Sequence, residues 1–177
     1  MTVPPRSCAN PVCRAQVLPL LAQLGTLISG SGDLQKTLAV LLQIMERHMG
    51  VVRGMVTLYH RQTGRIFVHE SLGLTDEEAA RGVYALGEGI TGKVVETGRI
   101  IVVRDIRTEP LFLNRTQSRD RDGEDLSFVC VPILRGRKVM GTISVERIYD
   151  TPERLEHDVE LLSIVAGMVA QEVELFL

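Results

Sequence analysis

The clearest pattern of apolar and polar positions lies between Leu126 and Arg147, on either side of the turn residues Arg135-Gly136. The residues from Ser127 to Leu134 are apolar or small, and those from Lys138 to Arg147 alternate. Alternation sends successive side chains of a strand to opposite faces, so this stretch predicts a β-hairpin. One face is expected to cover a core with Val139, Gly141, Ile143 and Val145. The other face is expected to meet solvent or a ligand with Met140, Thr142, Ser144 and Glu146.

Apolar residues at spacings of three and four predict helices at both ends of the chain. The first runs from Val17 to Ile28, and the second from an N-cap at Asp33 to a C-cap at Gly50. Thr151-Pro152 is typical of a helix start, and the last predicted helix follows it. This helix carries two neighbouring apolar stripes: Leu155, Val159, Leu162, Ala166, Val169, Val173 and Phe176 in one, and Leu161, Val165, Met168 and Leu175 in the other.

One apolar stripe is enough to cover a sheet, so the second stripe needs another surface to bury it. Two interpretations remain open: a helix that is broadly buried within the domain, or a homodimer seam shared with the first helix. The chain stops at Leu177 inside the apolar pattern, so we expect it to be a fragment of a longer protein. The residues predicted for a dimer and signalling surface are Leu20, Leu24, Leu27, Leu155, Val159, Leu162, Val169 and Val173.

The middle of the chain predicts strands at 51–60, 65–71 and 99–104 and two short helices. One helix follows the capping-box sequence Thr75 to Glu78, and the other follows the glycine-rich segment 87–92. Hairpins combined with terminal helices favour an α+β fold, with a central antiparallel sheet and the helices segregated to one face. Residues 1–14, which hold three prolines and two cysteines without periodicity, are expected to be a flexible leader, and residues 15–177 a single domain.

Composition excludes several classes of protein. The 177 residues carry a net charge of -2 and no basic tract, so no direct contact with nucleic acid is expected. The apolar runs are far too short to cross a membrane, and no signal peptide precedes them. Three cysteines do not make a disulfide framework. These features together predict a cytoplasmic location.

A glycine-rich segment and a pair of cysteines are candidates for a phosphate-binding site and a metal site. The segment Gly87 to Val94 nearly spells a P-loop, but Val94 replaces the hydroxyl that holds magnesium, and Gly82 to Leu86 is too weak a strand to support one. A glycine-shaped turn before a helix is the preferred interpretation. Cys8 and Cys13 have too few partners for a zinc or iron–sulfur site within one chain, although a dimer could pool them. Cys130 is expected to be a small buried apolar residue.

Residues 105–125 form the longest stretch without strong periodicity, although a helical turn is possible from Pro110 to Asn114. Loops of this length in compact domains are usually binding lids or disordered. Leu111-Phe112-Leu113 could pin the loop over the polar face of the hairpin, and an arginine held there would suit a carboxylate or phosphate. A solvated mixed-charge loop is the alternative. The arginines concerned are Arg107, Arg115, Arg119 and Arg121.

The segment Gly87 to Ile106, the Val131-Pro132-Ile133 tripeptide and the segment Gly141 to Arg147, taken with the element order, resemble a GAF domain. The resemblance covers about Val17 to Leu177. It implies a central antiparallel sheet with the N- and C-terminal helices on one face. It also implies that the helices and loops on the other face enclose a small ligand.

More narrowly, Glu109 to Thr116 and Leu126 to Ile133 resemble the N-terminal domain of NifA-type, sigma-54-dependent activators of nitrogen fixation genes. Some of these relatives carry a leader with cysteines, as this chain does at Cys8 and Cys13. The resemblance implies a parent protein with a downstream ATPase module and a DNA-binding domain. It also implies a small-molecule effector, with 2-oxoglutarate as the leading candidate, and a domain that is not an enzyme and holds no metal or cofactor.

Alternation and the lid sequence together predict a ligand site, in which Glu146 would need an arginine partner to tolerate a dicarboxylate. The alternatives are a redox or iron–sulfur sensor through Cys8 and Cys13, a methionine sulfoxide reductase through Cys130, or a ligand-free dimerisation module. The predicted ligand-binding residues are Met55, Thr57, Tyr59, Arg104, Phe112, Arg115, Phe128, Cys130, Thr142, Ser144 and Glu146.

Overall fold

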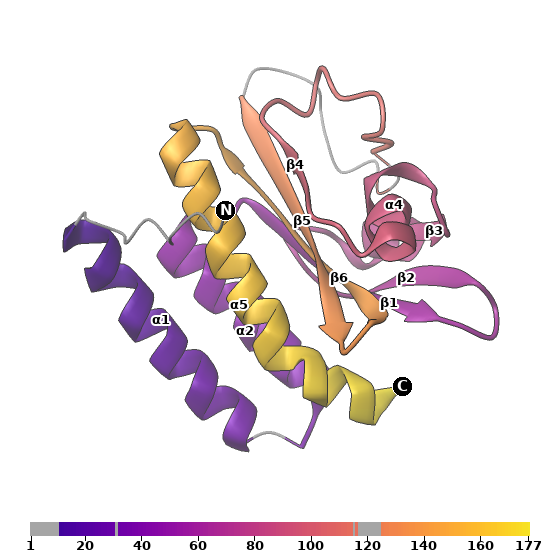
Figure 1. The fold of residues 1–177 in the computed structure, drawn as a ribbon, viewed down its shortest axis with the longest axis horizontal. Coiled ribbons are helices and arrows are strands. Elements are labelled where there is room, and N and C mark those ends of the chain that lie inside the picture. Colours follow the sequence, from indigo (N-terminus) through magenta and orange to yellow (C-terminus); the bar gives the residue numbers. More distant parts are fainter. Residues whose placement is uncertain (1–10, 31, 115, 117–124) are drawn as a thin grey trace, which may run out of the picture.

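The computed structural model describes residues 11–30, 32–114, 116 and 125–177, with only the backbone at 11–16, 29 and 30. An antiparallel sheet of six strands, in the order β3-β2-β1-β6-β5-β4, runs through the centre of the molecule (Figure 1). The predicted α+β class with an antiparallel sheet is confirmed. The strands are β1 (Arg53–His60), β2 (Arg65–Leu72), β3 (Val83–Ala85), β4 (Ile101–Val103), β5 (Leu126–Arg135) and β6 (Lys138–Ile148).

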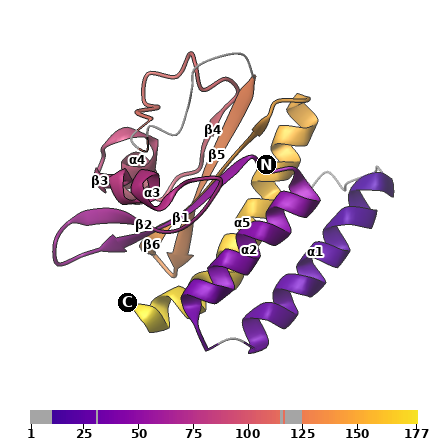
Figure 2. The ribbon, with the colours of Figure 1, turned by 180° about the vertical axis from the view of Figure 1, so that it is seen from behind.

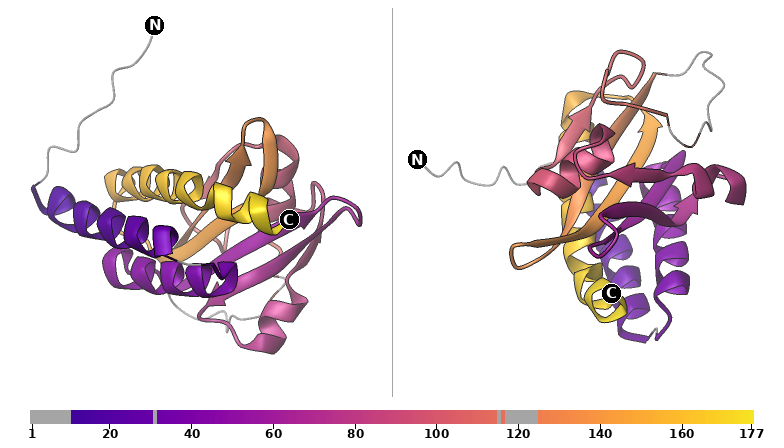
Figure 3. Two further views of the ribbon diagram at one scale, coloured as in Figure 1. Left: turned by 90° about the horizontal axis from the view of Figure 1, so that it is seen from below. Right: turned by 90° about the vertical axis from the view of Figure 1, so that its right-hand side faces the viewer.

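The helices divide between the two faces of this sheet. The chain termini contribute α1 (Pro11–Gly30), α2 (Leu34–Met49) and α5 (Pro152–Phe176) on one face. Helices α3 (Asp76–Arg81) and α4 (Gly89–Thr97) lie on the other face (Figure 2). Helices α2 and α5 lie next to the sheet, and α1 packs against both of them farther out (Figure 3). Helix α1 begins at Pro11, within the range 1–14 predicted as a leader; residues 1–10 lie outside the described residues.

Local sequence signals define the helix ends as predicted. The Asp33 side chain accepts a hydrogen bond from the Lys36 backbone, and Gly50 ends α2 at a φ of 70°. Thr75 and Glu78 form a reciprocal capping box at α3. Thr151 caps α5. Each cap satisfies backbone groups that the first or last helical turn leaves without partners.

The larger core lies between the sheet and the three terminal helices. Five of the residues predicted for a dimer surface have no exposed side-chain area, and the other three are partly buried against the same cluster. Most of the two stripes is therefore buried within the domain, whereas Phe176 and Leu175 at their ends are 55% and 77% exposed. The dimer seam stays a prediction. The five are Leu20, Leu24, Leu162, Val169 and Val173, and the other three are Leu27, Leu155 and Val159.

The hairpin faces follow the predicted alternation along most of β6, with one exception. Between Ile133 and Leu134 the register with β6 shifts, so that Ile133 pairs with Gly141 and Leu134 with Val139. The extra residue, Met140, joins the core under the terminal helices, whereas Val139 packs on the opposite side. The predicted faces of these two residues are wrong because a β-bulge inserts one residue and reverses the alternation beyond it.

One strand of the sheet was not predicted, and another is shorter than predicted. Strand β3 was not expected, and it pairs with β2 from Val83 to Ala85 at the edge of the sheet. Strand β4 covers only Ile101–Val103 of the predicted 99–104. Where a helical turn was considered from Pro110 to Asn114, the structure has one hydrogen-bonded turn at Pro110 and Leu111, in which the Phe112 N–H donates to the Glu109 carbonyl.

Candidate functional site

A small interior pocket lies between the sheet on one side and, on the other, α4 together with residues 105–114 and 116. We call residues 105–114 and 116 the lid. Strands β1, β5 and β6 bring their pocket-side residues into register: Met55 pairs with Ser144, Cys130 pairs with Ser144 from the other side, and Phe128 pairs with Glu146. The pocket is lined by Met55, Phe112, Phe128, Ser144 and Glu146 of the predicted site, together with Arg53, Leu74, Tyr84, Gly89, Ile90, Thr91, Leu111, Leu113, Asn114 and Thr116.

Glu146 is a buried carboxylate in this pocket, and it has the arginine partner that the sequence called for. The residue is 2% exposed as a whole, and Arg53 Nη1 lies 3.5 Å from Glu146 Oε2. Arg53 is not among the predicted ligand-binding residues, although alternation from Met55 and Thr57 places it on the same face of β1. Extending the predicted pocket face by one step would have found it.

The other predicted ligand-binding residues of the strands differ in whether their polar groups have hydrogen-bond partners. The hydroxyls of Thr57 and Thr142 bond to each other at 2.7 Å and are fully buried. Ser144 is 1% exposed, and its hydroxyl has no hydrogen-bond partner among the described residues. Burial raises the pKa of the Cys130 thiol to about 12, so this thiol stays protonated at neutral pH. Tyr59 does not line the pocket; it packs against a separate cluster around Ile66.

Two of the contacts that attach the lid to the rest of the domain lie next to the interior pocket. The Phe112 ring meets the Phe128 ring edge to face, with 5.2 Å between centroids. Arg81 of α3 donates hydrogen bonds of 3.1 and 2.7 Å to the Thr116 carbonyl. Leu111 and Leu113 remain about half exposed, so only the central residue of the predicted apolar anchor is held in the interior. No local sequence pattern signals the Arg81 contact, because it depends on how α3 packs against the lid.

Of the four arginines predicted in the lid region, only Arg107 is among the described residues. Arg115 lies outside the described residues, so its predicted ligand role stays a prediction. Arg107 does not point its charge at the pocket, because its guanidinium binds the carboxylates of Asp105, at 2.8 Å, and Asp125. Arg119 and Arg121 also lie outside the described residues.

The glycine-rich segment before α4 has a structural role rather than a phosphate-binding one. A Cβ on Gly92 would lie 2.3 Å from the Ala85 carbonyl oxygen, so only glycine fits this close approach. Gly89 adopts a φ of 60° and lies under Leu113 of the lid. The segment follows the antiparallel edge strand β3 rather than a buried parallel strand, which agrees with the rejection of a P-loop.

The interior pocket is nearly filled by side chains. Its two parts have volumes of about 30 and 10 Å³. Small-molecule sites usually enclose several hundred Å³, and a space of this size accommodates no more than a water molecule or two. As described, the interior pocket has no room for a metabolite.

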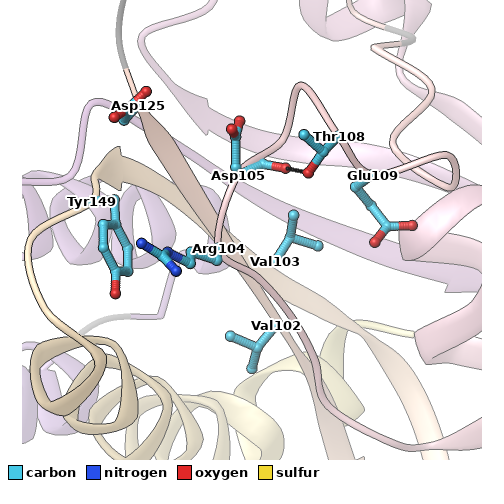
Figure 4. Close-up of a pocket in the computed structure, with 8 residues that line it drawn as sticks. All are labelled: Val102, Val103, Arg104, Asp105, Thr108, Glu109, Asp125 and Tyr149. Atoms are coloured by element: carbon cyan, nitrogen blue, oxygen red, sulfur yellow. Dashed lines mark hydrogen bonds between the residues drawn. The ribbon is translucent and has the colours of Figure 1, made fainter.

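A second and larger hollow, which we call the edge cavity, lies at the free edge of β4 and has a volume of about 400 Å³ (Figure 4). Arg104 lines this cavity and not the interior pocket, so the structure separates it from the other predicted ligand-binding residues. Its guanidinium lies over the Tyr149 ring, 4.7 Å from the centroid. The lining residues are Val102, Val103, Arg104, Asp105, Thr108, Glu109, Asp125 and Tyr149.

The carboxylates of the edge cavity are already held. Arg107, just outside the cavity, bonds Asp105 through two nitrogens and also bonds Asp125. Hydrogen bonding to Arg107 lowers the pKa of Asp105, so Asp105 stays ionised at neutral pH. Glu109 accepts a hydrogen bond from the Leu111 N–H.

The described part of the chain can also be assessed for a metal site and for a membrane-spanning helix. Among these residues, no three histidine, cysteine or acidic side chains are placed to hold a metal ion. No described helix is both long and apolar enough to span a bilayer. Cys8 lies outside the described residues and the Cys13 side chain is not described, so a cluster at these two positions stays a prediction.

Comparison with known proteins connects this architecture to a family. The family model of the GAF domain matches residues 33–173, which include the sheet, the lid, α2 and most of α5. The chain belongs to the GAF domain family. Residues 1–32 lie outside the matched segment.

Three curated relatives of the GAF chain are nitrogen fixation proteins. It is 62% identical over 172 residues to the nitrogen fixation protein VnfA of Azotobacter vinelandii, covering 96% of the chain and 33% of VnfA. It is 48% identical to AnfA of the same organism, covering 96% of the chain and 32% of AnfA. A Nif-specific regulatory protein of Herbaspirillum seropedicae is 39% identical, with 90% of the chain and 30% of the relative covered. The predicted resemblance to NifA-type N-terminal domains is confirmed, and the chain spans about a third of the length of these relatives.

Solved structures confirm the fold. The GAF domain of A. aeolicus nlh2 in an inactive state has a TM-score of 0.83 at 19% identity, covering 93% of this chain and 99% of that one. A free methionine-R-sulfoxide reductase from Neisseria meningitidis has a TM-score of 0.72 at 15% identity, covering 96% of each chain. Both likenesses concern the fold alone. The curated relatives above are named for nitrogen fixation and its regulation.

Proposed function

We propose that this GAF domain is a regulatory sensor, without enzymatic activity of its own, that binds a small effector in the interior pocket. The proposal rests on three polar residues that lie together beneath the lid: Glu146, Ser144 and Arg53. Glu146 and Ser144 are 2% and 1% exposed, and burying such groups costs free energy that an apolar core would avoid. A few polar groups among apolar walls are the usual composition of a small-molecule site. Similarity to nitrogen fixation regulators supports the regulatory role.

The effector that we propose first is 2-oxoglutarate, as the resemblance to NifA-type domains implies. Because Glu146 is paired with Arg53, the pocket does not hold an isolated negative charge that would repel a dicarboxylate. The closed pocket is too small for such a molecule, so binding requires the lid to move. The contacts that would break and re-form are those of Phe112 and Arg81.

The signal would pass from the pocket to α5 through neighbouring residues of β6. Successive strand residues face opposite sides, so Glu146 lines the pocket while Arg147 points to the helix layer. Arg147 Nη1 donates a hydrogen bond of 2.7 Å to Asp158 Oδ2 of α5, and Arg154 lies 3.5 Å from the other oxygen. A shift of β6 on effector binding would therefore be transferred to α5 through a buried ion pair.

The terminal helices would pass this change to the rest of the parent protein. In the NifA-type arrangement, a downstream ATPase module and a DNA-binding domain are the recipients. A homodimer through the terminal helices would couple two such proteins. The curated relatives are about three times as long as the matched segment, which leaves room for such modules in them.

Calorimetric titration of the reduced domain with 2-oxoglutarate tests the proposal, with succinate and cyclic AMP as controls. We expect saturable binding to 2-oxoglutarate, weakened about fivefold to tenfold in Ser144→Ala because one hydrogen bond to the effector is lost. Ser127→Ala is the matched control, since Ser127 is equally buried but bonds the Arg147 carbonyl away from the pocket. Absence of binding would eliminate 2-oxoglutarate as effector, and equal weakening in both variants would remove the interior pocket as its site.

A further inference from the structure

The β1–β2 and β5–β6 turns lie close together at one end of the sheet. Strand β1 pairs with β6, and Arg61 Nη2 in the first turn donates a hydrogen bond of 3.5 Å to the Val139 carbonyl beside the second. Figure 1 shows both turns near the C-terminal end of α5. The end of α4 reaches the same region, because a Cβ on Gly98 would lie 3.5 Å from Val139 Cγ2. Three segments that are distant in the sequence therefore meet here.

Cationic side chains gather where these segments meet. Two of them have acidic partners: Arg135 lies 2.7 Å from Glu174 of α5, and Lys93 lies 2.6 Å from Glu96 of α4. Five others are exposed and form no ion pair with another described residue. We call these five the turn surface: Arg61, Arg65, Arg99, Arg137 and Lys138.

The charge of the whole chain conceals this local surplus. Exposed carboxylates of Asp125, Asp150 and Glu153 lie at the opposite end of the sheet, where β5 begins, β6 ends and α5 begins. Strand β6 has 11 residues and so separates the two ends by roughly 35 Å. Charges on a protein surface are largely screened beyond about 8 Å at physiological ionic strength. Nearer to the turn surface, the Glu88 carboxylate accepts a hydrogen bond from the Ala85 N–H.

The composition of the turn surface fits a phosphate backbone better than an acidic protein. Four of its five cations are arginines, whose planar guanidinium can donate two hydrogen bonds to one phosphate. Gln62 and Thr63, exposed in the β1–β2 turn, are side chains of the kind that contact phosphate and sugar oxygens. Protein interfaces favour aromatic side chains at their centre, and neither turn contains Phe, Tyr or Trp.

We propose that the turn surface binds the phosphate backbone of double-stranded DNA without sequence preference. Composition alone predicted no contact with nucleic acid, because a net charge averaged over the chain does not reveal charges separated in space. In the proposed regulator, a separate DNA-binding domain would keep the duplex at high local concentration, so a weak contact is enough. The contact does not involve the interior pocket, and Ser144→Ala is expected to leave it unchanged. Failure of either proposal therefore leaves the other standing.

The test is fluorescence anisotropy of a labelled duplex of about 20 bp titrated with the whole chain at about 50 to 200 mM salt. We expect a Kd of about 100 µM or tighter at the lowest salt. The slope of log K against log salt concentration should be about -2.7 to -4.5, which corresponds to three to five phosphate contacts. Polyglutamate of the same charge serves as a competitor. Absence of binding would overturn the proposal, and so would equal competition by polyglutamate, which would assign the surface to an acidic protein.

Variants then locate the contact. Arg99→Gln and Arg137→Gln are each expected to weaken binding about fivefold and to make the salt slope shallower by about one unit, because each removes one phosphate contact. Glu174→Gln should strengthen binding, since it frees Arg135 from its acidic partner. Arg47→Gln is the matched control, because this exposed arginine lies in the last turn of α2, at the other end of the molecule. If Arg47→Gln weakens binding as much as the turn variants, the contact is diffuse and the proposal is overturned.

Discussion

The buried carboxylate of Glu146 depends on the guanidinium of Arg53, and the two partners are unequally placed. The Glu146 side chain is 3% exposed, whereas that of Arg53 is 22% exposed and can reach water. We therefore expect Arg53→Met to lower the free energy of unfolding by about 3 kcal/mol, because it removes a charged partner of a buried carboxylate. Glu146→Gln should lower it by only about 1 kcal/mol. Urea unfolding followed by circular dichroism measures both, with Arg65→Met on the exposed face of β2 as control; equal losses in the two pocket variants would contradict the argument.

Cys130 provides a second prediction at this scale. Its thiol has no exposed area, and burial raises its pKa to about 12, so the reactive thiolate is absent at neutral pH. An ordinary cysteine becomes reactive as the pH rises through about 8.5. We expect alkylation of Cys130 by iodoacetamide, followed by peptide mass mapping, to stay slow and show no such rise between pH 7 and pH 10. The same peptide in urea is the positive control, and a titration near pH 8.5 in the folded protein would revive the redox alternative.

At the scale of elements, the lid is held by a contact that can be removed without touching the pocket walls. Arg81→Met removes both hydrogen bonds to the Thr116 carbonyl. The amides of Leu111 and Phe112, which are bonded to Glu109 within the lid, should then exchange with deuterium about tenfold faster or more. Arg137→Met, in the exposed β5–β6 turn, is the control. Unchanged exchange in Arg81→Met would mean that this latch does not hold the lid closed.

Two glycines in different elements make a matched pair. A Cβ on Gly141 of β6 would lie 1.9 Å from the Thr57 carbonyl oxygen, whereas nothing lies within 4 Å of one on Gly167 of α5. Gly141→Ala should therefore force β1 and β6 apart and lower the free energy of unfolding by about 2 kcal/mol or more. Gly167→Ala should raise it by about 0.5–1 kcal/mol, since alanine favours a helix interior. Thermal unfolding compares the two, and the same sign for both would refute this account.

The elements that the sequence predicted correctly are those specified by local chemistry. Asp33, Thr75 and Thr151 each cap a helix with their own side chains, so the signal and the structure lie within a few residues. Strand β3 and the bulge at Met140 depend on a partner strand, and no local pattern announces either. The bulge explains why alternation failed for Val139 and Met140 but held from Gly141 onward.

At the scale of the whole molecule, alternation predicted the pocket side of the sheet but not the shape of the site. Met55, Phe128 and Glu146 lie together because their strands pair in register. Arg104 was assigned to the same pocket, yet it lies in the edge cavity, because sequence does not show where the chain turns after a strand ends. The closed interior volume is equally hidden, since it depends on how side chains from distant segments fill the space.

The homodimer proposed above must form through residues that the protomer leaves exposed. Ile164 on α5 is 47% exposed, near the middle of that helix, and Leu18 on α1 is 68% exposed. If the terminal helices form the seam, Ile164→Glu should weaken the dimer about tenfold or more by placing a charge in an apolar contact. Ile148→Glu is the matched control, because Ile148 is 52% exposed but lies at the end of β6. Sedimentation velocity over a range of concentrations measures the equilibrium, and a wild-type chain that stays monomeric, or equal effects of the two substitutions, would exclude a seam at this helix face.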